Sequence, residues 1–107
     1  MVNGCLRWGV VTQFSEDGDW QTDWHTRQAG YPFDVEVTSN GVYVANAGNH
    51  TIEKYSRSGT YIKLWGGYGG GDSQFAYIYG VGSDQSGNIY GTDYYNGAVK
   101  EFDPNGV

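Results

Sequence analysis

The chain has 107 residues, among them 18 Gly, 10 Tyr, 4 Trp and 4 Phe, and a formal net charge of −6. This content of apolar and aromatic residues is too high for a disordered chain, one cysteine cannot form an internal disulfide, and no apolar run is long enough to span a membrane. The basic residues are few and scattered, so the chain lacks the clustered Lys and Arg that nucleic-acid phosphates require.

Short stretches of alternating apolar and polar residues lie between turn residues along most of the chain. In chain order, clear examples are Val42–Ala45 after Asn40-Gly41, then Thr51–Tyr55, then Tyr61–Trp65 before a run of glycines. Runs of β-branched and aromatic residues bounded by Gly and Asn are typical of strands joined by hairpins. No long stretch free of Gly and Pro has the apolar spacing of a helix. The chain is therefore predicted to be all-β.

The sequence also repeats itself. Val10–Trp24 matches Thr51–Trp65 at an offset of 41 residues, and Ala98–Gly106 begins the same unit again at an offset of 47. Upstream of this unit, Tyr31–Gly41 matches Tyr77–Gly87 at an offset of 46. A period of this length that holds four short strands indicates a β-propeller blade. A lone four-stranded blade cannot bury both of its faces, so neighbouring blades must stack on it.

The repeating pattern resembles the NHL repeat. The residues that carry the resemblance are Pro32–Val37, Asn40–Asn46, Asn49–Ile52, Tyr55 and Gly59 in one copy, and Tyr79–Val81, Ser86–Tyr90, Asp93, Asn96, Val99, Phe102-Asp103 and Gly106 in the next. The chain departs from the family pattern at Asp34, where Gly is usual, at Asn46, where Asp is usual, and at Ile78, where Pro is usual. An Arg usual before the third-strand aliphatic residue is also absent, since Thr51 and Ala98 stand there. The resemblance covers about residues 10–107.

The resemblance implies one propeller segment over residues 1–107, built from blades of four antiparallel strands, a (innermost) to d (outermost). Strands c and d of a first blade occupy 10–24 (10–14 and 20–24), and a full blade occupies 34–65 (34–38, 42–46, 51–55 and 61–65). Strands a, b and c come again in 79–102 (79–83, 88–92 and 98–102). Hairpin turns are expected at Gly18, Gly41, Gly59, Gly87 and Gly106, where a positive φ costs glycine little.

About two and a quarter blades do not make a ring, because propellers of this kind generally have about six. Three explanations stay open: the chains oligomerise into a closed ring, the chain is a fragment of a longer propeller, or the fold is a smaller two-sheet arrangement. In the first, three chains would form a six-bladed ring. The last blade of one chain would then take its d strand from residues 20–24 of the next.

Ligands of propellers usually bind where the d-to-a and b-to-c loops emerge, here residues 25–33, 66–78, 46–50 and 93–97. Tyrosine combines apolar area with a hydrogen-bonding tip, which suits sugars, peptides and protein surfaces, a sister chain included. The candidate ligand-binding residues on these loops are His50, Tyr68, Asp72, Tyr77, Tyr94 and Tyr95. Asn49 and Asn96 are interpreted as residues that close the b–c turns.

The sequence predicts no catalytic residue, metal site or cofactor. His25 and His50 have neither a His-x-x-x-His spacing nor a nearby cysteine, so zinc is not expected. Ser15–Asp19 resembles a calcium loop but lacks the later bidentate Glu and is interpreted as a hairpin turn. Gly66–Gly71 opens no helix and is interpreted as a pliable crossover rather than a phosphate loop. Cys5 has no visible His or Asp partner for nucleophilic catalysis.

The leading functional hypothesis is a non-enzymatic recognition or scaffold module that binds protein or carbohydrate, because the resemblance implies a recognition platform. One alternative is a subunit of a lyase-like or lactonase-like enzyme with a metal ion in the central channel, where Asp34, Glu36 and Asp84 would lie. The other is a structural unit whose partner is itself. Nucleic-acid and membrane partners are not expected. The sequence does not identify the compartment; its acidic character slightly favours an extracellular or cell-surface protein, and no signal peptide is visible.

Overall fold

The computed structural model describes residues 8–14, 17–29 and 31–107. Within these ranges the chain forms nine strands in three antiparallel sheets and contains no helix, so the all-β prediction is confirmed. The described residues thus contain no helix long and apolar enough to cross a membrane. Cys5 and the Ser15-Glu16 part of the first predicted turn lie outside the described residues.

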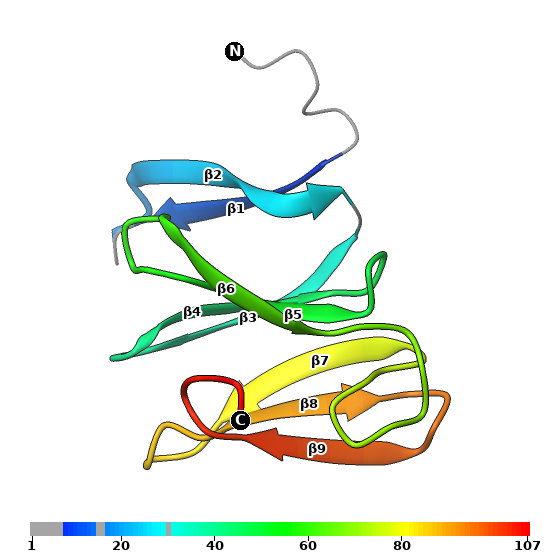
Figure 1. Ribbon diagram of the computed structural model, residues 1–107. Helices are drawn as coiled ribbons and strands as arrows, with labels where there is room; N and C mark the ends of the chain where they lie inside the picture. The colour runs from blue at the N-terminus through cyan, green and yellow to red at the C-terminus, as the bar shows by residue number, and fades with distance from the viewer. Residues whose placement is uncertain (1–7, 15–16, 30) are drawn as a thin grey trace.

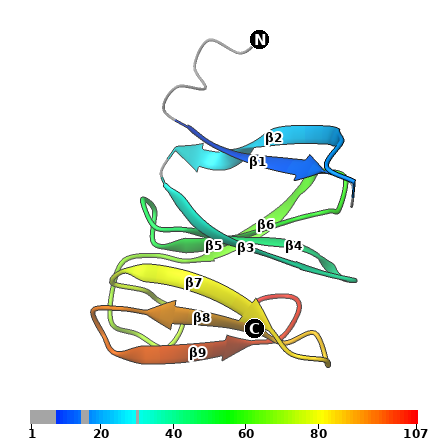
Figure 2. The same ribbon diagram turned by 180° about the vertical axis from the view of Figure 1, so that it is seen from behind.

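Each sheet joins strands that are consecutive in the sequence, and the sheets lie one above another (Figures 1 and 2). The first sheet pairs β1 (Trp8–Phe14) with β2 (Trp20–Ala29). The second has the order β3 (Pro32–Thr38), β4 (Gly41–Asn46), β5 (Thr51–Tyr55), β6 (Tyr61–Gly66). The third has the order β7 (Ile78–Ser83), β8 (Ile89–Asp93), β9 (Ala98–Phe102).

Strand β2 is longer than the sequence predicted. Residues 25–29 were expected in a loop, but β2 continues to Ala29, which lies opposite Trp8 of β1. The register shifts between Trp8, opposite Ala29, and Val10, opposite His25, so the pairing is irregular there. No turn-forming residue occurs between Trp24 and Gly30, so nothing in the sequence stops the strand earlier. The bounds of the other strands differ from the predicted ones by no more than two residues.

Three hairpin turns share one hydrogen-bond pattern. Ser56, Asp84 and Asp103 each begin a turn, accept the N–H of the glycine three residues on, and donate their own N–H to the carbonyl of the residue after that glycine. The side-chain oxygen of each also accepts the N–H of the residue after the glycine, at 3.0 Å in all three turns. The glycines have φ angles of 98°, 88° and 85°, a region that side chains disfavour. The sequence repeat is therefore also a repeat of local geometry.

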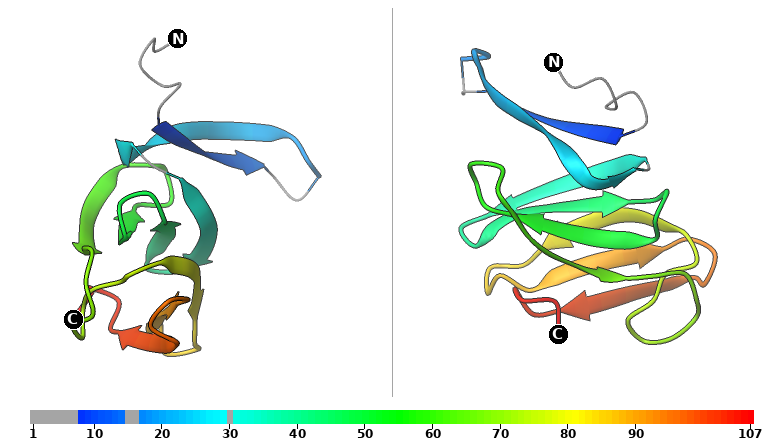
Figure 3. Two further views of the ribbon diagram at one scale, coloured as in Figure 1. Left: turned by 90° about the vertical axis from the view of Figure 1, so that its right-hand side faces the viewer. Right: turned by 45° about the horizontal axis from the view of Figure 1, so that its top comes forward.

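The two central strands of the second sheet, β4 and β5, are buried on both sides. One face carries Tyr43, Ile52 and Trp65, which pack in one cluster with residues of the third sheet such as Ile89 and Phe102. On the opposite face, Val42, Val44 and Tyr55 form a second cluster, against which Val11 of β1 packs. Figure 3 shows the second sheet between the other two. Because β4 and β5 face protein on both sides, their residues are all buried, polar ones included.

Candidate functional site

The connector between β6 and β7, residues 67–77, is held firmly against the sheets. Phe75 is fully buried in the core. The Gly67 N–H donates to the His50 carbonyl at 2.8 Å, and the Phe75 N–H donates to the Gly67 carbonyl at 2.8 Å. The Lys100 ammonium donates to the Gly71 carbonyl at 2.7 Å and lies 5.5 Å from the centre of the Phe75 ring. The sequence predicted a pliable crossover at Gly66–Gly71; in the structure the connector makes these contacts with the sheets.

Asp93, at the end of β8, anchors the last part of this connector. Its carboxylate accepts the N–H groups of Ala76 at 3.0 Å and Tyr77 at 3.1 Å, and the Asn96 side-chain amide at 2.7 Å. Burial disfavours the charge, but these hydrogen bonds outweigh it and hold the pKa of Asp93 below its usual value. Asp93 thereby fixes the backbone from which the Tyr77 ring projects.

Around Tyr77, five aromatic rings gather at the ends of the second and third sheets. We call them the aromatic cluster: Phe33, Tyr77, Tyr79, Tyr94 and Tyr95. The Tyr77 ring centre lies 5.3 Å from that of Tyr95, 6.0 Å from that of Phe33, and 6.2 Å from those of Tyr79 and Tyr94. Most of these contacts are tilted or edge-to-face, the arrangement that aromatic quadrupoles favour. Tyr94 and Tyr95 are nonetheless 68% and 71% exposed, so the cluster presents ring surface to solvent.

A hollow of about 300 Å³ lies beside the aromatic cluster. Its lining residues are Tyr31, Phe33, Ala47, His50, Tyr68, Ala76, Tyr77 and Tyr95. No Asp, Glu, Lys or Arg is among them. The His50 ring makes an edge contact with Tyr68 at 5.0 Å, and its Nδ1 is buried without a hydrogen-bond partner in the described chain. The hollow is therefore lined by aromatic rings that carry tyrosine hydroxyls and one imidazole.

The structure brings together most of the candidate residues predicted from the sequence. His50, Tyr68, Tyr77 and Tyr95 line the hollow, and Tyr94 belongs to the adjoining aromatic cluster. Asp72 is exposed on the connector and does not line the hollow. Asn96 bonds Asp93 and the Gly69 carbonyl, so its role includes the connector as well as its own turn.

Phe33 and Tyr79 were not among the predicted residues, although they belong to the cluster. Tyr79 lies on the inner strand β7, whereas the prediction considered loops; Phe33 lay in the predicted loop 25–33 but was not selected, and the structure places it on the inner strand β3. Their rings are 5.8 Å apart. The repeat contained a usable signal, because Phe33 and Tyr79 occupy equivalent positions at the offset of 46 residues. An aromatic side chain at one position of both inner strands predicts neighbouring rings where those strands lie side by side.

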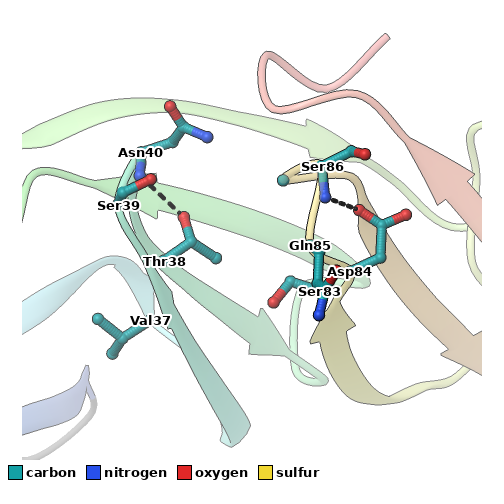
Figure 4. A pocket seen from close by; sticks show the side chains of 9 residues that line it. Val37, Thr38, Ser39, Asn40, Ser83, Asp84, Gln85 and Ser86 are labelled. Atoms are coloured by element: carbon teal, nitrogen blue, oxygen red, sulfur yellow. Dashed lines mark hydrogen bonds between the residues drawn. The ribbon is translucent and has the colours of Figure 1, made fainter.

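A second hollow, of about 270 Å³, lies at the opposite ends of the strands, between the β3–β4 and β7–β8 turns (Figure 4). Its lining is polar, with Thr38, Asn40 and Asp84 among its residues. Asp84 accepts the Tyr90 hydroxyl at 2.8 Å and the Ser86 N–H at 2.9 Å, and such bonds hold its pKa below the usual value. The hydrogen bond between the Tyr90 hydroxyl and Asp84 raises the pKa of Tyr90 to about 12. The Asp84 carboxylate therefore already has hydrogen-bond partners in its own turn and in the neighbouring strand β8.

The acidic residues considered for a channel metal do not converge. Asp34 accepts the Val81 N–H at 3.1 Å, Glu36 accepts the Ser83 hydroxyl, and Asp84 caps its own turn. Across the described ranges, no three His, Cys, Asp or Glu side chains are grouped so that they could hold a metal ion. Asp34 and Glu36 instead link β3 to β7.

A scan against protein-family models finds no match for the chain, and a search of curated proteins finds none either. The similarity to NHL repeats therefore stays a prediction that rests on the residues themselves.

Proposed function

We propose that the chain is a segment of an NHL-like β-propeller and acts as a non-enzymatic recognition module. Support for the propeller comes from consecutive antiparallel strands in each sheet, sheets stacked face to face, and equivalent turns at equivalent repeat positions. Two arrangements would complete the ring: further copies of the chain, or further repeats in a longer chain.

The observation that carries the recognition role is the exposed aromatic cluster beside an uncharged hollow. Large exposed apolar patches usually mark binding surfaces, because exposing them to water is costly. Tyrosines present rigid ring faces together with hydroxyl groups, so they bind ligands that have both apolar and hydroxyl surfaces. A neutral carbohydrate has this combination and needs no charged residue to hold it. We therefore propose a neutral carbohydrate as the ligand, with the hydroxyl groups of the exposed Tyr94 and Tyr95 as partners for its own hydroxyls.

A binding role fits this site better than catalysis. General acid–base chemistry needs two positioned titratable groups, or one group beside a nucleophile or metal. Apart from tyrosine hydroxyls, His50 is the one titratable side chain among the residues that line the described hollow. The residues of the channel-metal alternative, Asp34 and Glu36, hold the third sheet to the second.

The test is titration of the protein with neutral oligosaccharides, followed by calorimetry or tyrosine fluorescence. We expect Tyr94→Ala/Tyr95→Ala to weaken binding at least tenfold, about 1.4 kcal/mol, because it removes exposed ring faces. Tyr61→Ala is the matched control: Tyr61 lies on β6, where it pairs with Tyr55, at the strand ends away from the cluster. It should leave affinity unchanged.

Equal affinity in the double variant would overturn the proposed site. Binding of a protein ligand but no carbohydrate, with the same loss in the variant, would keep the site and change the ligand class.

A further inference from the structure

The outward side of the third sheet repeats a surface that is buried in the second. We call it the outer face: Tyr90, Thr92, Val99 and Glu101, on β8 and β9. At the repeat offset of 47 residues, these positions correspond to Tyr43, Ala45, Ile52 and Lys54. Ile52 is fully buried against the third sheet, whereas its equivalent Val99 is 68% exposed. A surface with the pattern of an interface is therefore uncovered at this end of the stack.

At the other end of the stack, part of the second sheet is also uncovered. Val35 and Val37 of β3 are 46% and 55% exposed. Their register opposite Val44 and Val42 places them on the side of the second sheet that faces the first. The first sheet has two strands, and Val11 of β1 packs against the cluster of Val42, Val44 and Tyr55. We call Val35 and Val37 the valine strip.

The repeat relates the two uncovered surfaces to each other. Val11, Ile52 and Val99 occupy equivalent positions at offsets of 41 and 47 residues. Within one chain, Val11 packs on Val42, Val44 and Tyr55. Val99 of another copy is also a valine at the equivalent position of its strand. It can therefore pack on Val42, Val44 and Tyr55 in place of Val11. Strands β8 and β7 of that copy would then cover the valine strip, which is exposed in the single chain.

Charge complementarity supports a second copy as the occupant. Inside the chain, the Lys54 ammonium and the Tyr43 hydroxyl both donate to the Pro104 carbonyl, at 2.8 and 2.9 Å. The equivalents of Lys54 and Pro104 are Glu101 and Arg57. Both side chains are exposed. In a contact between two copies that repeats the internal one, the Glu101 carboxylate of one copy comes to the Arg57 turn of the other. The contact between copies would therefore bring the negative Glu101 near the positive Arg57. The corresponding contact within the chain joins Lys54 to the Pro104 carbonyl.

We propose that the outer face of one copy docks on the valine strip side of a second copy, repeating the contact between the second and third sheets. In this contact the third sheet of one copy and the first sheet of the other would form one sheet. Strands β1 and β9 are both repeats of β5, so only one of them can occupy the third position of that sheet. Strand β9 is already paired with β8, and no strand of the described chain pairs with its other edge. We infer that β9 takes the place of the second copy's β1, with that copy's β2 as the fourth strand. Such a head-to-tail contact closes into a ring when its rotation allows.

The first experiment measures the solution mass of the full chain by light scattering over a range of concentrations. We expect a closed assembly whose mass is a multiple of 11.8 kDa, with three copies completing six blades. Val99→Arg should raise the dissociation constant at least tenfold, because a charge would be buried in the contact. Ser73→Arg, at an exposed position on the connector between β6 and β7, is the control and should assemble as the wild type does. Circular dichroism checks that each variant is folded.

The second experiment tests the charge pair. Glu101→Arg and Arg57→Glu should each weaken assembly, because each places like charges together, and the double variant Glu101→Arg/Arg57→Glu should restore it. A monomer at every concentration would overturn the proposal and favour a further repeat of a longer chain as the occupant. Assembly unaffected by Val99→Arg, or a double variant no better than the single ones, would also overturn it. Loss of assembly without loss of oligosaccharide binding would leave the proposed ligand site standing.

Discussion

At the scale of single residues, Asp93 joins the connector to the third sheet. Asp93→Asn should lower the free energy of unfolding by about 1–3 kcal/mol, because a neutral amide replaces a buried carboxylate that accepts several N–H groups. Denaturant unfolding of the two proteins measures this difference. Asp72→Asn is the control, since Asp72 is exposed on the same connector. An equal effect of both substitutions would contradict the anchoring role of Asp93.

The loss from Asp93→Asn should depend on pH. The pKa of Asp93 is lower in the folded protein than the usual 3.8, so the folded state binds its proton less tightly than the unfolded state. The stabilisation is therefore present above pH 3.8 and is lost as the pH falls through the folded pKa. The difference in melting temperature between wild type and variant should narrow below pH 3.8. A difference that stays constant into strong acid would contradict this assignment.

The sequence predicted some residue roles and missed others for a physical reason. Asn96 was predicted to close a turn, a local role that spacing can reveal, and it does bond the nearby Asp93. Asp93 itself reaches Ala76 and Tyr77, which lie in the connector before β7. Local patterns do not tell which chain segment will lie over a given carboxylate, because that depends on how the connector folds back.

At the scale of elements, the hairpin turns differ in what surrounds their glycines. Gly18 and Gly106 have φ angles of 89° and 85°, so alanine at either costs about 1–2 kcal/mol in backbone strain. A Cβ at Gly106 would also lie 2.6 Å from the Trp65 ring, whereas a Cβ at Gly18 meets no atom of the described residues within 4 Å. Gly106→Ala should therefore destabilise the protein more than Gly18→Ala. Thermal unfolding of both variants measures this, and equal losses would contradict the packing of this turn on Trp65.

Alternation and turn residues were sufficient to place the strands, because both are local properties of the chain. Two elements needed more than local patterns. Strand β2 continues past Trp24 because its partner β1 offers further pairing, with Trp8 opposite Ala29. The glycine-rich connector turns back so that Phe75 is buried in the core with residues of the second and third sheets. In both cases the deciding contact comes from a separate segment, which local patterns do not identify.

At the scale of the whole molecule, the proposed assembly links stability to concentration. If copies bind one another in the folded state, mass action raises the melting temperature as the protein becomes more concentrated. Val99→Arg should remove this dependence, while Ser73→Arg should keep it. Differential scanning calorimetry over a series of dilutions measures the effect. A wild-type melting temperature independent of concentration would count against self-association.

The sequence repeat predicted stacked sheets in a general form, because each unit has two apolar faces. It did not predict which side chains of neighbouring sheets would meet at the ends of the strands. The rings of Phe33 and Tyr79 come together because β3 and β7 lie side by side, a relation between strands of different sheets. Periodicity within one strand tells which residues share a face, and only the packing of sheets tells which faces meet.

The consecutive order of strands within each sheet has a consequence for how the protein folds. Every strand pairs with a neighbour in the sequence, so loop closure costs little entropy and pairing can begin within one sheet. The second sheet is the natural starting point, because β4 and β5 are buried on both faces and gain most from early packing. Their amide hydrogens should exchange most slowly with solvent, and those of β1 and β9, at the two ends of the stack, should exchange first.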